Sequence, residues 1–183
     1  MRYDVEMVCD SFEKKENLKF LYFWGQRRSE GEITKACLSQ WYNSDFIVDG
    51  IVYNCVEQFM MAEKARLFGE EQILAEILET SEQFRIKYLG KQIKNFDEEI
   101  WEKERYNIVV RGNIAKFSQN EEIKKFLLNT GYKVIVQASP YDYIWGIGLL
   151  EDEIIKTNDP TKWKGKNLLG FALMEVRDKL YQI

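Results

Sequence analysis

The chain has 183 residues, the length of one large domain. Hydrophobic residues make up 45% of it and charged residues 31%, a composition typical of a folded globular protein that excludes a disordered chain. Its net charge of −4 excludes the broad basic face that phosphate-dominated nucleic-acid binding requires, although a local phosphate pocket stays open. The chain contains no histidine, which excludes histidine triads, histidine zinc sites and histidine general bases.

The cysteines and the N-terminus bear on where the protein acts. Cys9, Cys37 and Cys55 are odd in number and widely spaced, which is typical of a reducing compartment and gives no C-x-x-C pair for zinc. Residues 1–16 carry several acids and no long apolar segment, so we expect no secretory signal. No apolar run approaches the roughly 20 residues that span a bilayer. We therefore predict a cytoplasmic protein with no membrane partner.

The first half of the chain predicts short strands and then a helix. Residues 18–24 have the pattern of a short apolar strand. Residues 46–53 are two β-branched runs joined by Asp49-Gly50, the preferred pair for a two-residue type I′ hairpin. The following periodicity predicts a helix from Val56 to Phe68, closed by Gly69 in a left-handed conformation.

The second half of the chain is mostly helical. Asn95, with Glu98 three residues later, resembles a capping box, and Gly90 resembles a helix stop. Helices are expected at about 70–78, 81–89, 95–117 and 120–130, with a strand at 133–138 and a terminal helix capped by Asn167. With two prolines and no Gly/Ser-rich linker, the sequence predicts a single domain over residues 1–183. We expect an α+β fold, rich in helix, with a few short, mostly antiparallel strands.

The helix expected at 56–68 carries two charges on its apolar side. Glu57 and Lys64 are seven residues apart, so they point the same way from about two turns of helix. The remaining members of that stripe are apolar, namely Met60, Met61, Ala65 and Phe68. One interpretation is a buried ion pair that ties the helix to a neighbour. The other is an acid and an amine in a dry cleft, where their pKa values are displaced into a catalytic range.

A second group of residues follows the strand expected at 133–138. The loop of residues 138–148 contains Asp142, Trp145, Gly146 and Gly148 directly after the strand. Loops at strand ends often carry binding groups, and glycines let a backbone approach a ligand closely. The alternative is a tight turn in which Asp142 accepts hydrogen bonds from its own backbone.

A third group lies just before the terminal helix. Lys164, Lys166 and Asn167 precede or begin that helix, whose free N–H groups and positive dipole end would suit an anion. The alternative is a solvated basic turn in which Asn167 is an ordinary N-cap.

Together these blocks resemble the YbiA-like family, also called NADAR, over about residues 22–177. The resemblance is carried by ordered motifs: Phe23-Trp24; Leu38 to Tyr42; Phe46, Val48, Asp49 and Gly50; Tyr53, Glu57-Gln58, Met60-Met61, Lys64-Ala65 and Phe68; Leu89-Gly90 and Trp101; Asn113, Lys116-Phe117, Leu128 and Thr130-Gly131; Ala138-Ser139-Pro140, Asp142 and Trp145 to Gly148; Trp163, Gly165, Asn167 to Gly170, and Arg177.

The resemblance implies an N-glycosidase that cleaves the bond between C1 of a (phospho)ribose and a nitrogen base or amine. Its substrate classes are ribosylamino-pyrimidine phosphates of early riboflavin synthesis and ADP-ribose carried on guanine. It also implies that Glu57, Lys64, Trp101, Asp142 and Trp145 line the site. Where many members of the family have a glutamate, this chain has Gln137, a departure that puts the activity or the substrate choice in doubt.

With no histidine, we expect carboxylates and an amine to perform the chemistry, without a metal or a cofactor. Glu57 is the expected proton donor to the leaving nitrogen, and Asp142 is expected to stay ionised and orient a ribose hydroxyl or activate water. Lys64 either holds a phosphate or, as a neutral amine, forms a Schiff base with C1 of a ring-opened aminoribose, and an apolar setting favours the second role. The expected substrate contacts are Trp24, Trp101, Trp145, Gly146, Lys164, Lys166 and Asn167.

Other functions stay open at this stage. A sensor module that binds NAD or ADP-ribose derivatives without catalysis would use the same pocket, and a scaffold with a chance ion pair would use none. An extended nucleic-acid interface is not expected. ADP-ribosyl-guanine in DNA remains open as a substrate, because a pocket for one nucleotide needs no basic surface.

Overall fold

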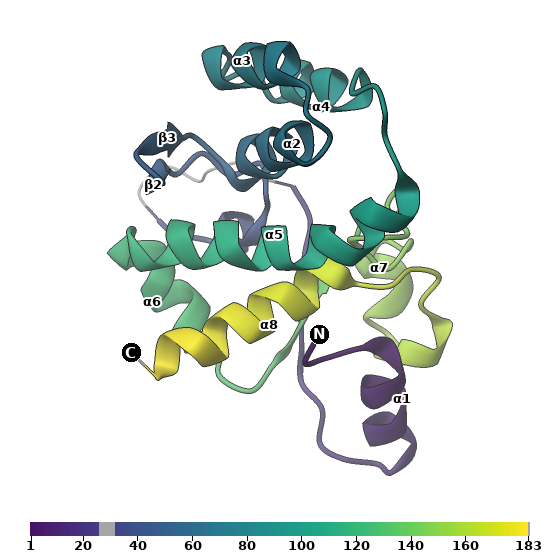
Figure 1. Cartoon of the computed structure of the whole chain (residues 1–183). Helices are drawn as coiled ribbons and strands as arrows, with labels where there is room; N and C mark the ends of the chain where they lie inside the picture. Colours follow the sequence, from purple (N-terminus) through teal and green to yellow (C-terminus); the bar gives the residue numbers. More distant parts are fainter. Residues whose placement is uncertain (26–31, 183) are drawn as a thin grey trace. The chain divides into compact units, whose positions relative to one another are not determined.

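The computed structural model describes residues 1–25 and 32–182, and the chain divides into two compact units. One unit comprises residues 1–39 and 122–183, and the other comprises residues 40–121. Figure 1 labels the helices and strands of both units. A single domain over the whole chain stays a prediction.

The unit of residues 1–39 and 122–183 is built on one pair of strands. Strand β1 (Phe20–Phe23) pairs with β4 (Val134–Gln137) in parallel, with Phe20 opposite Val134. The sequence favoured antiparallel pairing, but strands so far apart in the chain can pair in parallel, because a long connection lies between them. The unit's other elements are α1 (Val5–Glu13), η1 (Lys35–Leu38), α6 (Glu121–Asn129), α7 (Glu151–Ile154), η2 (Pro160–Lys162) and α8 (Leu168–Tyr181).

Helix α8 packs directly against β4. Gly170, in its first turn, lies so close to the carbonyl of Ile135 that no side chain fits there. Near the other end of α8, the buried Arg177 donates from Nη1 to Thr130 Oγ1 (2.9 Å) and to the carbonyl of Lys133 (2.8 Å). These contacts hold β4, and the segment that precedes it, in a defined position on the helix.

The unit of residues 40–121 is a β-hairpin followed by four helices. Strands β2 (Phe46–Val48) and β3 (Ile51–Tyr53) pair in antiparallel fashion, as predicted. Asp49 (φ 52°) and Gly50 (φ 79°) both have positive φ, which is the geometry of a type I′ turn. The helices are α2 (Val56–Leu67), α3 (Glu71–Glu79), α4 (Gln83–Lys91) and α5 (Glu98–Ser118).

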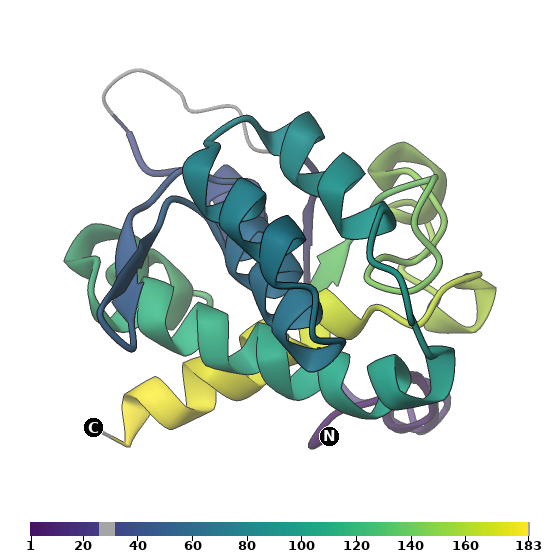
Figure 2. The ribbon, with the colours of Figure 1, turned by 45° about the horizontal axis from the view of Figure 1, so that its top comes forward.

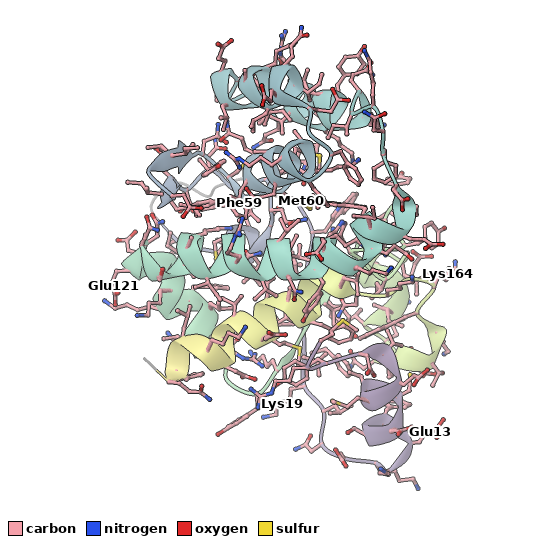
Figure 3. All side chains as sticks on the ribbon, viewed as in Figure 1. Glu13, Lys19, Phe59, Met60, Glu121 and Lys164 are labelled. Atoms are coloured by element: carbon pink, nitrogen blue, oxygen red, sulfur yellow. The ribbon has the colours of Figure 1, made fainter. Side chains whose placement is uncertain are left out.

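Helix α2 is the centre of this unit. It contacts α3, α4 and α5, and Figures 1 and 2 both show it with the α3–α4 pair on one side and α5 on the other. A Cβ on Gly112 of α5 would lie 2.7 Å from the ring of Phe59, so glycine permits the close approach of α2 and α5. Phe59 points toward α5 in Figure 3. This position explains why α2 is buried on several sides. Even the polar residues Glu57 and Gln58, in its first turn, are buried.

Two helix boundaries differ from the predictions. Helix α5 is capped by Asp97, whose carboxylate accepts from the N–H of Ile100 (3.0 Å), whereas Asn95 lies before it in a left-handed conformation (φ 51°). Both residues are good N-caps, and the sequence pattern did not discriminate between them. Gly90 lies inside α4 and does not end it; a side chain there would collide with the sulfur of Met61. The helix-rich α+β class itself is confirmed.

Candidate active site

Glu57 lies in the first turn of α2, almost completely buried at 6% exposure. Cys55, in extended conformation, is the N-cap of the helix, and Glu57 follows where a carboxylate is favoured by the positive end of the helix dipole. The first N–H groups of a helix find no acceptor within the helix itself. The backbone N–H of Glu57 donates instead to the carbonyl of Gln40 (3.0 Å). The local backbone therefore holds this acid in a protected position.

Lys64, two turns further along α2, is half-buried, and its ammonium group lies beside two aromatic rings. Its Nζ donates to the carbonyl of Gly90 (3.0 Å) and lies 4.1 Å from the ring centroid of Phe96 and 5.6 Å from that of Trp101. Burial lowers the pKa of Lys64 from its ordinary value, and the negative charge of Glu98 opposes this effect. A larger fraction of the amine is therefore neutral near pH 7 than in an exposed lysine.

Glu57 and Lys64 lie two turns apart on α2. Seven residues of helix place their Cα atoms about 10 Å apart along the axis, so each side chain has its own surroundings. Of the apolar residues of this stripe, Met60, Met61 and Ala65 are buried as predicted, and Phe68 is half-buried.

Helix α5 supplies one of the two aromatic rings beside Lys64. Trp101 is buried, and its ring lies by the Lys64 ammonium group, as a residue lining the same site would. One turn further along, Arg105 is also buried; its guanidinium contacts Glu102 (2.7 Å) and Glu98 (3.6 Å), while its Nε has no hydrogen-bond partner. Phe96 and Arg105 were not among the predicted site residues. Only the position of Arg105, four residues after Trp101, would have indicated it.

In the other unit, Asp142 forms the turn that the alternative interpretation predicts. Its Oδ1 accepts from the N–H groups of Ile144 (3.0 Å) and Trp145 (2.7 Å). Asp142 and Trp145 are each half-buried. The turn leaves the second carboxylate oxygen of Asp142 outside these two hydrogen bonds, so a structural and a chemical role are compatible.

The loop after β4 is joined to the segment before α8 by backbone hydrogen bonds. The carbonyl of Ile147 accepts from the N–H groups of Lys164 (2.9 Å) and Gly165 (3.0 Å), and that of Gly146 accepts from Asn167 (3.1 Å). A Cβ on Gly146 would lie 2.9 Å from the carbonyl oxygen of Gln137. Glycine at position 146 therefore permits a close approach to the protein's own backbone, and its contact with a ligand stays a prediction.

The backbone N–H groups at the start of α8, which the predicted anion site would use, already have acceptors within the protein. The N–H groups of Leu168 and Leu169 donate to the carbonyls of Ile144 (3.2 Å) and Trp145 (3.1 Å), so a phosphate would find them occupied. Asn167 is 0% exposed and makes no side-chain cap to α8.

The Asn167 amide instead contacts β4. Its Nδ2 donates to the carbonyl of Ile135 (3.0 Å), and its Oδ1 accepts from the N–H of Gln137 (3.0 Å). Asn167 thus positions β4 against α8, and its contact with a substrate stays a prediction. Lys164 and Lys166 are exposed, and Lys164 extends from the surface in Figure 3.

Two further features lie near the ends of β1 and β4. Trp24, just after β1, is 53% exposed, and its ring centroid lies 6.4 Å from that of the exposed Tyr141. Tyr141 was not predicted; its place next to Asp142 was the available signal. The side-chain oxygen of Gln137 is buried without a hydrogen-bond partner. A glutamate at this position would place a carboxylate where this chain has a neutral amide.

The structure brings the predicted residues together in two groups. Glu57, Lys64 and Trp101 belong to residues 40–121. The remaining predicted residues belong to the other unit, namely Trp24, Asp142, Trp145, Gly146, Lys164, Lys166 and Asn167. A common site for the two groups stays a prediction. Over residues 1–25 and 32–182, no group of at least three Cys, Asp or Glu side chains is arranged to hold a metal ion, and no helix combines the length and hydropathy of a membrane span.

Comparisons with known proteins relate both units to one family. The NADAR domain model matches residues 22–181. The N-glycosidase R617 of Acanthamoeba polyphaga mimivirus is 42% identical over 172 residues, covering 91% of this chain and 99% of that protein. The N-glycosidase YbiA of Escherichia coli (strain K12) is 29% identical over 133 residues, covering 73% of this chain and 74% of YbiA. The NMR structure of E. coli YbiA superimposes with a TM-score of 0.71 at 25% identity, covering 90% of this chain and 86% of YbiA. The chain therefore belongs to the NADAR domain family.

Proposed function

We propose that this protein hydrolyses the bond between C1 of a (phospho)ribose and a nitrogen base or amine. The protein is a hydrolase that acts on N-glycosyl compounds, the activity for which its mimivirus and E. coli relatives are named. The proposed substrates are ribosylamino-pyrimidine phosphates, as in early riboflavin synthesis, or ADP-ribosyl-guanine. The protein is proposed to act in the cytoplasm without a metal or cofactor.

One observation carries the proposal: the Lys64 amine lies beside the rings of Phe96 and Trp101, where burial lowers its pKa, on the same helix as the buried Glu57. A lysine that only binds phosphate binds it best when the amine is fully protonated and in polar surroundings. A lysine that attacks a carbon must be neutral, and desolvation makes it so. The surroundings of Lys64 therefore favour the nucleophile over the phosphate ligand, and the exposed Lys164 and Lys166 are assigned to the phosphate.

The proposed reaction runs through a covalent intermediate. Protonation of the ribose ring oxygen opens the ring and leaves C1 double-bonded to the leaving nitrogen. The neutral Lys64 Nζ adds to C1, and the leaving nitrogen takes a proton and departs with its bonding electrons, which leaves a Schiff base between C1 and Nζ. Water then adds to C1, and the C1–Nζ bond breaks to release the free sugar and the amine of Lys64.

Glu57 is assigned the proton transfers of this sequence, because it is the buried acid on the helix that carries Lys64. Trp101, at 5.6 Å from the Lys64 ammonium group, is assigned to line the pocket beside C1. Asp142 is assigned to a ribose hydroxyl or to the attacking water, and Trp24 and Trp145 to the base. These last three assignments rest on the family resemblance.

The experiment measures release of free base from both substrate classes. Purified protein is incubated with a ribosylamino-pyrimidine phosphate and, separately, with ADP-ribosyl-guanosine, and the released base is quantified by chromatography. Release from one substrate, lost in Glu57→Gln and retained in Glu104→Gln, an exposed glutamate of α5, supports the proposal. Tight binding of either compound without turnover would identify a sensor module instead. Normal turnover by Glu57→Gln would remove Glu57 from the proton transfers.

A further inference from the structure

Lys116 of α5 is a buried cation that the proposed mechanism does not use. Its side chain is 0% exposed, and lysine is almost never completely buried unless it is paired. Its Nζ lies 5.0 Å from the ring centroid of Phe117 and 5.4 Å from that of Tyr42. Ring faces attract a cation but do not neutralise it, so the cost of desolvating the ammonium group calls for an anion nearby.

The packing of α2 against α5 indicates which anion this is. The two helices run in opposite directions along their contact: Lys64 meets Trp101, Glu63 forms an ion pair with Arg111, and Val56 lies against Gly112. Lys116 is one turn beyond Gly112 on the same face of α5. The register thus directs Lys116 toward the start of α2, where Glu57 is 6% exposed.

The Cys55 thiol provides a second, independent link. Burial raises the pKa of Cys55 to about 11; the charge of Glu57 adds to this rise, and the charge of Lys116 opposes it. Glu57 and Lys116 therefore both lie within electrostatic range of the same buried sulfur. Cys55, Lys116 and Tyr42 are the titratable groups that these contacts place at this end of α2.

We infer that Lys116 is a positioning residue, whose ammonium group fixes the Glu57 carboxylate in place at the start of α2. The inference rests on the proposed function, because it assigns the orientation and charge of the acid that the mechanism uses. Lys116 does not contact the substrate. It orients the Glu57 carboxylate and sets the pH at which Glu57 takes up and gives up the proton that the mechanism moves.

The first test concerns folding and does not depend on activity. Unfolding midpoints in urea are measured for Glu57→Gln, Lys116→Met, the double variant and the control Lys103→Met, an exposed lysine of the same helix. If the two groups interact, each single change leaves a buried charge without its partner, and the double variant loses less stability than the sum of the two. Additive losses would overturn the inference, whatever the substrate of the enzyme.

The second test concerns the pH profile of kcat/KM with the substrate that is turned over. Lys116→Met is expected to shift the limb that reports Glu57 upward by about one pH unit or more, with the loss in kcat and not in KM. Lys116→Arg, which keeps the charge, should show little of this shift and a pH profile close to that of the parent protein. If Lys116→Met lowers the stability of the protein but leaves the pH profile of kcat/KM unchanged, the role of Lys116 is purely structural and the inference is overturned. If Lys116→Met does not fold, the double variant should recover folding; equal failure of both would also overturn the inference.

Discussion

Replacement of Asn167 by alanine removes the amide that joins α8 to β4. The side chain makes two hydrogen bonds of 3.0 Å, to the carbonyl of Ile135 and from the N–H of Gln137, and it is completely buried. Two buried hydrogen bonds contribute about 2 kcal/mol, and the backbone groups left without partners add to the cost. Alanine is also less tolerant than asparagine of the positive φ of 50°, at a cost of about 1 kcal/mol. We expect a total loss of about 3–4 kcal/mol.

Asn95 provides a matched control for this prediction. It has nearly the same left-handed backbone (φ 51°) but is exposed, so Asn95→Ala measures the backbone cost alone. Urea unfolding of both variants should therefore show a loss about 2–3 kcal/mol larger for Asn167→Ala than for Asn95→Ala. Equal losses would refute the reasoning, because they would mean that the buried amide contributes nothing beyond its backbone conformation.

Three further predictions follow from the other unit. Gly112→Ala places a methyl group 2.7 Å from the ring of Phe59. The free energy of unfolding, measured by thermal unfolding, should fall by about 1–3 kcal/mol, and a fall of less than about 0.5 kcal/mol would contradict the tight approach of α2 and α5. Cys55, with its pKa raised to about 11, should resist a thiol reagent at pH 8 in the folded protein and react on unfolding; rapid labelling of the folded protein would contradict its burial. Burial lowers the pKa of Lys64 in the folded protein, so between that pKa and the unfolded value near 10.5 the unfolded chain binds more protons than the folded protein. The free energy of unfolding of the parent, relative to that of Lys64→Met, should therefore rise as the pH increases through this range. Urea unfolding of both proteins at pH 7 and pH 10 checks this, and a fall would contradict the direction of the pKa shift.

Local patterns predicted the hairpin and α2 well. Asp49-Gly50 supplies the two positive φ angles of a type I′ turn with little strain, so few other structures compete at this position. The apolar stripe of α2 has a strict period, and Gly69 (φ 69°) follows it where a left-handed residue is needed. Glu57 and Lys64 stood out because they interrupt that stripe, and a single sequence carries this kind of signal.

Other features depend on contacts between distant segments, which no local pattern records. The parallel pairing of β1 with β4 joins segments more than a hundred residues apart. The start of α8 looked like an anion site because the sequence does not reveal that the carbonyls of Ile144 and Trp145 occupy its N–H groups. Lys116 appeared in the family motif, but only the register of α2 against α5 relates it to Glu57.

The most direct measurement of the central claim is chemical trapping at Lys64. Substrate is added in the presence of sodium borohydride or cyanoborohydride, and the digested protein is analysed by mass spectrometry. The Schiff-base mechanism predicts a reduced sugar adduct on the peptide that contains Lys64. It also predicts that turnover is lost in Lys64→Arg, which keeps the charge but cannot form the imine. Full turnover by Lys64→Arg, or trapping at another lysine, would contradict it.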